Sequence, residues 1–493
     1  MPGLLRLRPD NAPQVFFARD ASPLEEHTRL REAFPGGGEV RVALTGPGLF
    51  TTEGLAWAGE LETRLAEVEG VRLAAGPLAV HRWSESAWPP SDLAAYRARL
   101  DRAAAGRMAG WVAPDGGTLS SLVLFEPGAG PATLAAVEHA VSGSPTGVEV
   151  HLTGLPVLQR ALDEGVQSVA FRIVPLLVGV STLLLLLVFR RLRRALAPLL
   201  LVGFVELVTF GAMGYAGAPI NLVNSVLAPL LFVIGLASAV HVLMQFVRTH
   251  TGGQDPVEAA QRTFRDKAPP IVWSGATTFV AFGSLALSDL PVVSALGGWS
   301  ALGIAVLTAA MFTLYPALLV WAAGARGAHT PPVLEAHASR WGRSLAEGAV
   351  RHRHSVTVAT LALMGACTAG LPRLAVGDDL VMAFREGHPA RASLDFLQDE
   401  KMGAFPLEVL VELGAPESPE GAGLREPARL QALAELSARL RDDPRIAAAF
   451  GPGDLVEEAI EAILVEGEVD ENLRWMALAT VQSVPESKAL LRS

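Results

Sequence analysis

The sequence predicts a membrane α-helical bundle that is flanked on both sides by α/β domains. Half of the 493 residues are hydrophobic, and the apolar side chains are concentrated in the middle of the chain. Because the hydrocarbon core of a bilayer is about 30 Å thick, a helix needs roughly 17 to 25 mainly apolar residues to cross it. The chain contains six runs of this kind, at 173–189, 195–217, 222–247, 270–288, 292–322 and 355–371.

The basic residues between these runs predict their orientation. The turn between the first two runs is crowded with arginines, at Arg190, Arg191, Arg193 and Arg194. More Arg and Lys residues lie between the third and fourth runs and between the fifth and sixth, whereas the alternate connections, 216–221 and 289–291, carry only Asp289. Since cytoplasmic loops carry the excess of positive charge, we expect the basic loops inside and both flanking domains outside.

The first flank alternates between strand and helix patterns. Strands are expected at 39–44, 119–125 and 148–154, and helices at 53–69 and 131–141. The second of these helices begins with Pro131, whose missing N–H costs nothing in the first turn. Strands and helices in this order predict a sheet with helices on one face.

The second flank repeats this order. The segment 384–403 parallels 17–37, a strand pattern at 406–413 parallels 39–44, a helix pattern at 427–440 parallels 53–69, and 447–455 parallels 72–80. Duplication explains this order better than chance similarity, and the second copy stops at Ser493 before its last helix and strand. The predicted domains are an external α/β domain at 1–165, five spans at 166–325, a cytoplasmic linker helix at 326–354, a sixth span at 355–372 and a second, incomplete external α/β domain at 373–493.

Composition and short motifs argue against several kinds of function. A net charge of −10 with no basic face argues against a nucleic-acid partner. The single cysteine lies in an apolar run, so no disulfide framework is encoded. His352 and His354 form a weak metal pattern, and the glycines at 36–38 lack the Lys and Ser or Thr of a phosphate loop. We therefore expect no catalytic residue, metal or cofactor, and no enzyme activity.

Polar residues inside the apolar runs are the candidate site. Ser238, His241 and Gln245 are three and four residues apart, so they share one helix face. Glu206 is the only carboxylate deep inside a span. Because such groups are costly in hydrocarbon, they mark proton or water paths, although interhelical hydrogen bonds that only hold the bundle together are the alternative.

Other polar and small residues in the spans are expected to serve the structure. Asn221 is placed to cap the helix after it, and Thr277 and Thr278 are expected to bond back to their own helix. Glycines in the spans are expected to allow close helix packing, namely Gly203, Gly211, Gly214, Gly275 and Gly283. Two further helices, at 256–267 and 332–351, are either interfacial or solvated linkers.

Four segments in a fixed order resemble the resistance–nodulation–division (RND) superfamily, and most closely its MMPL-like exporters of lipids and other hydrophobic molecules. The segments are HLTGLPVLQRALDEGVQ, RRLRRALAPLLLV, GAPINLVNSVLAPLLFVIGLASAVHVLMQF and RDKAPPIVWSGATTFVAFGSLALSDLP. The specific elements are APIN, the Gly-x-x-x-x-x-His run, Thr-Thr-x-x-x-Phe and Ser-Asp-x-Pro.

The resemblance implies twelve helices in two repeats, ferredoxin-like porter domains outside the membrane, and proton antiport through acids in the fourth and tenth helices. This chain would be the amino-terminal part, without the first helix and most of the second repeat, so it would need the remaining half or an oligomer partner. The acid of the fourth helix would fall at Ala237 or Ser238, and neither is acidic. The proton-coupling candidates are Glu206, His241, Ser238 and Gln245.

The expected function is therefore export of lipids or other hydrophobic molecules, driven by the proton gradient across the cytoplasmic (inner) membrane of a bacterium. The large domains would face the periplasm, and the partners would be membrane lipids or hydrophobic small molecules and protons. Two alternatives stay open. One is a lipid-binding module similar to sterol-sensing domains that does not pump, and the other is a helper of protein translocation or assembly.

Overall fold

The computed structural model describes residues 6–18, 22–33, 36–77, 92–104, 110–250, 255–324, 333–374, 384–403 and 427–443, and short pieces at 409, 411, 446–449, 451 and 453–454. The fold is mostly helical with one small sheet. It forms two compact units, each assembled from two stretches of the chain. We call Met1–Leu24 with Leu162–Asp378 the bundle unit, and Glu25–Ala161 with Asp379–Ser493 the sheet unit.

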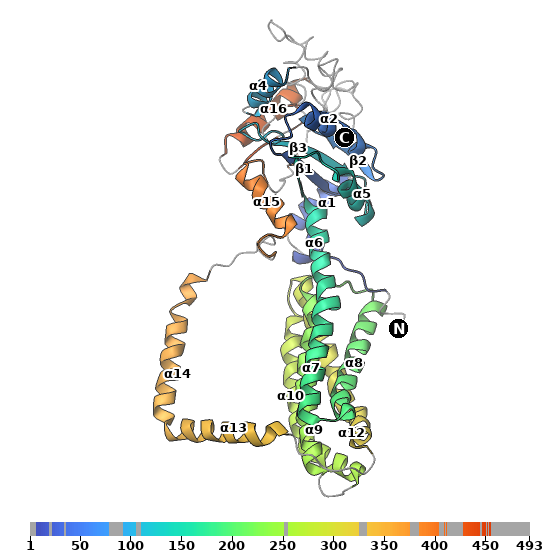
Figure 1. The fold of residues 1–493 in the computed structure, drawn as a ribbon, viewed down its shortest axis with the longest axis vertical. Coiled ribbons are helices and arrows are strands. Elements are labelled where there is room, and N and C mark those ends of the chain that lie inside the picture. Colours follow the sequence, from blue (N-terminus) through green and yellow to red (C-terminus); the bar gives the residue numbers. More distant parts are fainter. Residues whose placement is uncertain are drawn as a thin grey trace. The chain divides into compact units, whose positions relative to one another are not determined.

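Long helices run side by side in the bundle unit (Figure 1). Its main helices are α7 (Val174–Phe189), α8 (Leu192–Tyr215), α9 (Leu227–Thr249), α10 (Pro256–Leu285), α11 (Pro291–Thr313), α12 (Tyr315–Ala323), α13 (Val333–Arg351) and α14 (Arg353–Thr368). Shorter elements are the 3-10 turns η2 (Pro13–Phe16), η4 (Asn224–Val226) and η5 (Leu371–Arg373). Helix α6 (Leu155–Ser168) leads from the sheet unit into α7 through a π-helical turn, η3 (Val169–Ile173).

Among the described residues, five helices are long and apolar enough to cross a membrane: Leu155–Phe189, Leu192–Tyr215, Asn224–Thr249, Pro291–Thr313 and Arg353–Arg373. They contain the predicted spans 173–189 and 355–371 completely, 195–217 and 222–247 almost completely, and the first part of 292–322. The predicted span 292–322 is interrupted at Leu314, between the end of α11 and the start of the short helix α12.

The predicted span 270–288 forms the second part of α10, a helix that is not among the five. Helix α10 is continuous from Pro256 through Pro269 and Pro270 to Leu285, so the predicted helix 256–267 belongs to the same element. Threonine, serine, glycine and proline dilute its apolar side chains, which is why a sixth span stays a prediction. The expected helix at 332–351 is present as α13, and the helix after it, α14, has no buried residue.

Apolar side chains from α7 to α12 make up the core of the bundle, and small residues bring the helices together. A side-chain carbon on Gly303 would lie 2.6 Å from Leu231, and one on Gly275 would lie 2.4 Å from Thr308. The prediction that Gly275 is a close-packing position is therefore confirmed. For Gly203, Gly211 and Gly283 it is wrong within the described part of the chain, because nothing there lies within 4 Å of the position of an added side chain.

The sheet unit contains four strands, β1 (Glu39–Thr45), β2 (Val71–Ala75), β3 (Leu119–Phe125) and β4 (Glu149–Thr153). Their order in the sheet is β2-β3-β1-β4, and all neighbours are antiparallel. The strands expected at 39–44, 119–125 and 148–154 are confirmed as β1, β3 and β4. The chain order is β1, α2 (Thr52–Ala66), β2, α4 (Leu93–Ala104), β3, α5 (Pro131–Val141) and β4, preceded by α1 (Ser22–Ala33).

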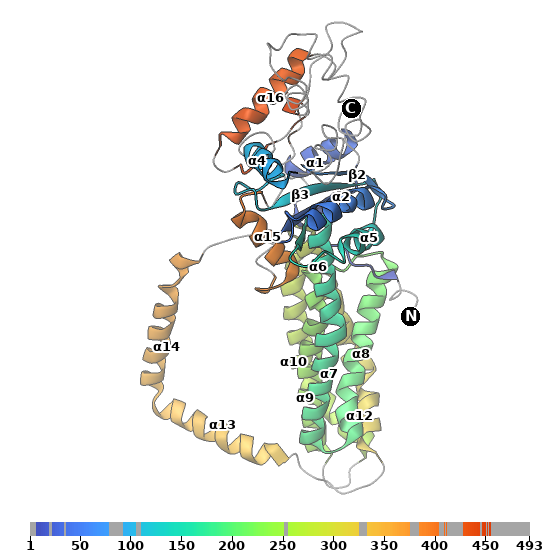
Figure 2. The same ribbon diagram turned by 45° about the horizontal axis from the view of Figure 1, so that its top comes forward.

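Alternation along β1 gives the sheet two buried faces. Val40, Val42 and Leu44 enter an apolar core shared with α2, α4 and α5, whose helices lie on one face (Figure 2). Thr51 caps α2, because its hydroxyl oxygen accepts a hydrogen bond from the N–H of Gly54 at 3.0 Å. On the other face Ala43 packs with Leu397 from the second flank. Both flanks therefore contribute to one folded unit.

The second face of the sheet also carries polar contacts to the second flank, whose helices are α15 (Pro389–Asp399) and α16 (Pro427–Arg441). The Arg41 guanidinium donates hydrogen bonds to the carbonyl oxygens of Met402 at 2.7 Å and Gly110 at 3.2 Å. The His151 ring stacks on Phe396 of α15, with ring centroids 4.0 Å apart. The Nε2 atom of His151 is buried and has no hydrogen-bond partner among the described residues.

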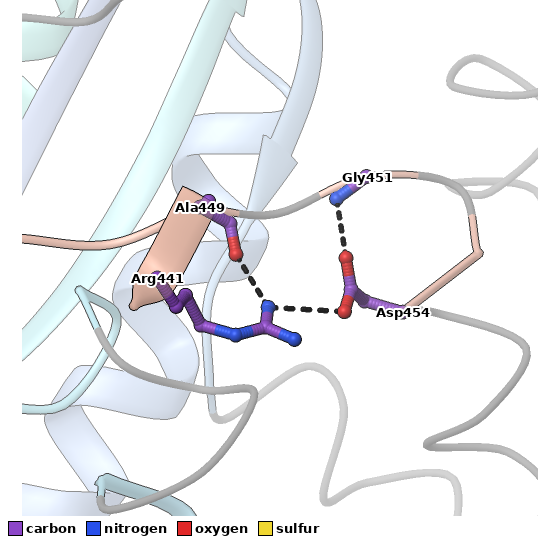
Figure 3. Close-up of polar contacts among 4 residues, drawn as sticks. All are labelled: Arg441, Ala449, Gly451 and Asp454. Carbon is purple, nitrogen blue, oxygen red and sulfur yellow. Dashed lines mark hydrogen bonds and ion pairs between the residues drawn. The ribbon is translucent and has the colours of Figure 1, made fainter. Parts of the chain in front are cut away.

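The end of α16 is tied to the turn that follows it (Figure 3). Arg441 donates a hydrogen bond to the carbonyl oxygen of Ala449 at 2.7 Å and pairs with the fully buried Asp454 at 3.0 Å. The Asp454 carboxylate also accepts from the N–H of Gly451 at 2.8 Å. Helices α15 and α16 occupy two of the positions that the repeat predicts, whereas all but 409 and 411 of the expected strand at 406–413 lies outside the described residues.

Two adjacent glycines in α11 test the helix packing. An alanine at Gly297 would place its Cβ 2.6 Å from the backbone nitrogen of Ala286, which no rotamer change can relieve, whereas nothing lies within 4 Å of the same position on Gly298. We expect Gly297→Ala to lower the free energy of unfolding by about 1–3 kcal/mol, measured by denaturation of the protein in detergent. Gly298→Ala should be neutral or stabilising by up to about 1 kcal/mol. Equal effects of the two changes would contradict this packing.

His151 makes the packing of α15 sensitive to pH. Burial lowers the pKa of His151 below its ordinary value, although nearby Glu149 offsets part of this effect. The unfolded chain takes up a proton on His151 more readily than the folded protein does. The contribution of His151 to stability should therefore be fully present above its unfolded pKa of about 6.5, and it should be lost as the pH falls from there through the lower pKa of the folded protein. His151→Phe keeps the ring stack without the titration, so its thermal unfolding temperature should fall less between pH 7.5 and pH 5 than that of the unmodified protein.

Candidate functional site

The predicted polar stripe lies on one face of α9, and that face is turned out of the bundle. Ser238 and Gln245 are half-buried, and His241 is exposed. The opposite face of α9 is buried in the core through Leu231, Gly235, Ala239, Val242, Leu243 and Phe246. A polar row on the outside of a membrane helix needs a cover of protein or water, because hydrocarbon offers no hydrogen bonds.

Glu206 lies on α8, beside the buried face of that helix. Its side chain is half-buried, and Oε1 is shielded from solvent without a hydrogen-bond partner among the described residues. Thr209, one turn away, does not serve as this partner, since its hydroxyl donates to the carbonyl oxygen of Val205 at 2.8 Å. An unpaired carboxylate in apolar surroundings is costly as an anion.

The structure does not bring Glu206 and the stripe together. Helices α8 and α9 touch where Gly235 faces Val202. Glu206 lies four residues beyond Val202 in one axial direction, and His241 lies six residues beyond Gly235 in the other direction, because the two helices are antiparallel. With a rise of about 1.5 Å per residue, the two side chains differ by roughly 15 Å in depth. The four candidates therefore form two sites at different levels.

Tyr315 holds α9 in place directly behind the stripe. It is fully buried at the start of α12, and its hydroxyl donates a hydrogen bond to the carbonyl oxygen of Ala239 at 2.7 Å. Ala239 follows Ser238, so this bond fixes the backbone beside the first residue of the stripe. Nothing in the sequence pattern distinguishes Tyr315, because an aromatic residue in an apolar run is typical of a packed core.

The polar residues that were predicted to be structural are confirmed in that role. The N–H of Asn224 donates to the side-chain oxygen of Asn221 at 2.9 Å, and the N–H of Asn221 donates to the side-chain oxygen of Asn224 at 2.7 Å. This reciprocal pair resembles a capping box at the start of the third span. The hydroxyls of Thr277 and Thr278 both donate to carbonyl oxygens of their own helix.

A buried asparagine near the start of the chain joins two elements at the same end of the bundle unit. The side-chain amide of Asn11, only 3% exposed, donates to Asp163 of α6 at 2.7 Å. Its oxygen accepts from the N–H of Leu222, in the turn before α9, also at 2.7 Å. The backbone of 8–10 pairs with Ile220 beside it. We call 8–11 the clasp.

Sequence reasoning missed the clasp because both partners of Asn11 are far away in the chain. A single asparagine in a segment without hydrophobic periodicity looks like any loop residue. Only the structure distinguishes Asn11, because it shows that both the NH2 group and the oxygen of its side-chain amide form hydrogen bonds. Among the described residues, no group of three or more His, Cys, Asp or Glu side chains could hold a metal ion.

Comparison with known proteins matches residues 90–354 to a family described as the MMPL family. Three relatives are named only "Putative membrane protein". MJ1562 of Methanocaldococcus jannaschii is 30% identical over 36% of this chain and 45% of its own length. YdgH of Bacillus subtilis is 25% identical over 36% of this chain and 20% of its own, and SCO5905 of Streptomyces coelicolor is 31% identical over 28% and 17%. The chain thus spans less than half the length of these relatives.

The contact between the clasp and α6 can be tested by exchanging the side chains of Asn11 and Asp163. Asn11→Asp would place a second carboxylate against Asp163, and we expect it to lower the free energy of unfolding by about 1–3 kcal/mol at pH 7. The loss should shrink as the pH falls and one carboxyl takes up a proton. Adding Asp163→Asn restores a donor and an acceptor in reversed order, so the double variant should recover most of the stability. A direct contact would be contradicted if the double variant lost as much thermal stability as the two single variants together.

Proposed function

We propose, because this chain belongs to the MMPL family, that it forms part of a membrane exporter of lipids or other hydrophobic molecules. The observation that carries the proposal is the family match, which extends over more than half of the chain and includes the helices of the bundle. The five helices that are long and apolar enough to cross a membrane support it. The names of the relatives also support a membrane location.

We assign proton coupling to Glu206 first and to His241 second. Glu206 is neutral when it holds a proton, and it would become an unpaired anion on releasing it. Release therefore requires a rearrangement that brings water or a partner to its oxygen. A proton can shift the bundle between two conformations only if they bind it with different affinity. A carboxylate that is shielded in one conformation and reaches water or a partner in the other would provide this difference.

The exposed stripe of Ser238, His241 and Gln245 is proposed to face the rest of the transporter. The half-buried serine and glutamine and the exposed histidine would line a proton or water path once a second set of helices, or a second copy, covers them. The uncovered helix α14 supports this view, because none of its residues is buried. We propose further that 373–493 forms a second external α/β region, whose helix α15 packs against the sheet of the first.

The antiparallel sheet supports a ferredoxin-like porter domain in the space outside the membrane. Its strand order β2-β3-β1-β4, with α2 and α5 as crossover helices, is the order of a split βαβ fold. Together with the basic inner loops, this order supports a location of the large domains on the periplasmic side of a bacterial inner membrane. A hydrophobic passenger would pass through these domains.

A lipid-binding module that does not pump is the second candidate. The observation that favours it is the absence of an acid at Ala237 and Ser238. Such a module would bind hydrophobic molecules with or without a gradient, and no net movement would follow. A helper of protein translocation, the third possibility, has no particular residue in its favour.

The experiment is lipid movement in vesicles that contain the intact protein, followed with and without an imposed pH gradient. We expect the gradient to accelerate movement for the unmodified protein, and Glu206→Gln to reduce the rate to that of protein-free vesicles because the side chain can no longer release a proton. Thr209→Val is the matched control, since its hydroxyl bonds only to its own helix. It should keep the gradient response.

Two results would contradict parts of this proposal. Undiminished gradient-driven movement by Glu206→Gln would remove Glu206 as the proton carrier. Binding of lipid by the unmodified protein without any movement would favour the module that does not pump.

A further inference from the structure

The turn between α7 and α8 contains an arginine whose surroundings differ from those of its neighbours. Arg190 ends α7 in a left-handed conformation with φ of 53°, and Arg191 precedes the first residue of α8. Arg190 and Arg193 are exposed, whereas Arg194 is only 4% exposed. Positive charge in a cytoplasmic loop explains the exposed residues. It does not explain a buried one.

Arg194 has no counter-charge in the described part of the bundle unit. Its Nε atom is buried without an acceptor, and its side chain forms no hydrogen bond or ion pair there. It shares a buried helix face with Ala197, Pro198 and Leu201. A guanidinium does not lose its proton in proteins, and a buried charge without a partner is strongly unfavourable. An anion supplied from outside this unit would remove the penalty.

The protein itself offers few acids at this end of the bundle. The sequence has no Asp or Glu between 173 and 205, between 227 and 254, or between 315 and 334. Outside these stretches, acids occur at Glu206 in α8, in the first turns of α10, where Glu258 pairs with Arg262, and in α13. Asp255 and Asp266 on the same helix are exposed and form no hydrogen bond with Arg194.

The start of α8 adds to the attraction for an anion. Its 24 residues align their peptide dipoles, so the positive end of the helix lies at the arginine cluster. The residue before the first turn, Arg191, does not cap the helix with its side chain. The positive charges of Arg190, Arg193 and Arg194 at this end of the helix are unfavourable unless an anion accompanies them.

The surroundings indicate that this anion belongs to a lipid. Arg193 lies over the ring of Trp321 on α12, at 5.8 Å, and Trp321 is 41% exposed. Tryptophan is enriched at the level of lipid headgroups. Leu187 and Leu192, on either side of the turn, expose large apolar side chains that acyl chains would cover.

We propose that the inner ends of α8 and α12 bind the headgroup phosphate of an anionic phospholipid, with Arg194 as its buried ligand. Arginine binds phosphate oxygens through a fixed fork of N–H donors, which makes it suited to this role. Basic pockets between membrane helices bind such headgroups. The lipid at this site acts as a structural ligand, and the inference does not depend on what the protein exports.

The test uses the full protein in nanodiscs of phosphatidylcholine, with and without phosphatidylglycerol. For the unmodified protein, phosphatidylglycerol should raise the thermal unfolding temperature and appear as retained lipid in native mass spectra. Arg194→Met removes the buried charge but keeps much of its volume. We expect this variant to unfold at the same or a higher temperature in phosphatidylcholine alone, and to lose both the phosphatidylglycerol shift and about 90% or more of the retained lipid.

The matched control is Arg343→Gln, which removes an exposed charge from α13. It should keep both effects. The proposal is overturned if Arg194→Met keeps the phosphatidylglycerol shift, because general electrostatic attraction would then explain it. A loss of stability of Arg194→Met in phosphatidylcholine, with no lipid effect on either protein, would show that an acid of the protein already pairs with Arg194. If inorganic phosphate raised the unfolding temperature in phosphatidylcholine nanodiscs as much as phosphatidylglycerol does, a lipid would not be the source of the anion.

Discussion

The structure of the bundle depends on one constraint, which is that hydrocarbon gives no hydrogen bonds to polar groups. Most polar side chains of the bundle obey it in simple ways. The threonines bond back to their own helices, Asn221 and Asn224 cap one another's backbone, and Tyr315 finds the carbonyl oxygen of Ala239. These bonds turn polar residues into fixed joints between or within helices. They also leave a short set of residues whose needs the bundle does not meet.

That unsatisfied set is where function is expected. Glu206 has a shielded oxygen without a partner, the α9 stripe faces outward, and Arg194 is buried without a counter-charge. Each lies at a different depth, so each requires a different partner. A proton suits Glu206, further helices suit the stripe, and an anion suits Arg194. The same constraint thus separates a coupling position from an assembly surface and from a lipid site.

The sheet unit follows a different physical rule. Its β-sheet has one face covered by helices from the first flank, and the other face would be exposed without α15 and the contacts of Arg41 and His151. The second flank was expected to fold as a separate domain similar to the first. In the structure its helix α15 packs on the sheet of the first flank. The likeness of the two flanks in sequence does not reveal this, because packing partners are not written in the order of elements.

The sequence by itself determined the class of the protein, since apolar length, charge asymmetry and the order of family segments are local properties. It predicted most of the spans, three of the four strands, the cap at Asn221 and the bonds of the threonines. It also selected Glu206, because a carboxylate in an apolar run is visible without coordinates. Tertiary structure alone decided that Ser238 and His241 face outward, that Asn11 joins Asp163 to Leu222, and that Arg194 is buried. The physical reason is that burial and pairing depend on which helix faces meet, and those faces belong to residues that are tens to hundreds of positions apart.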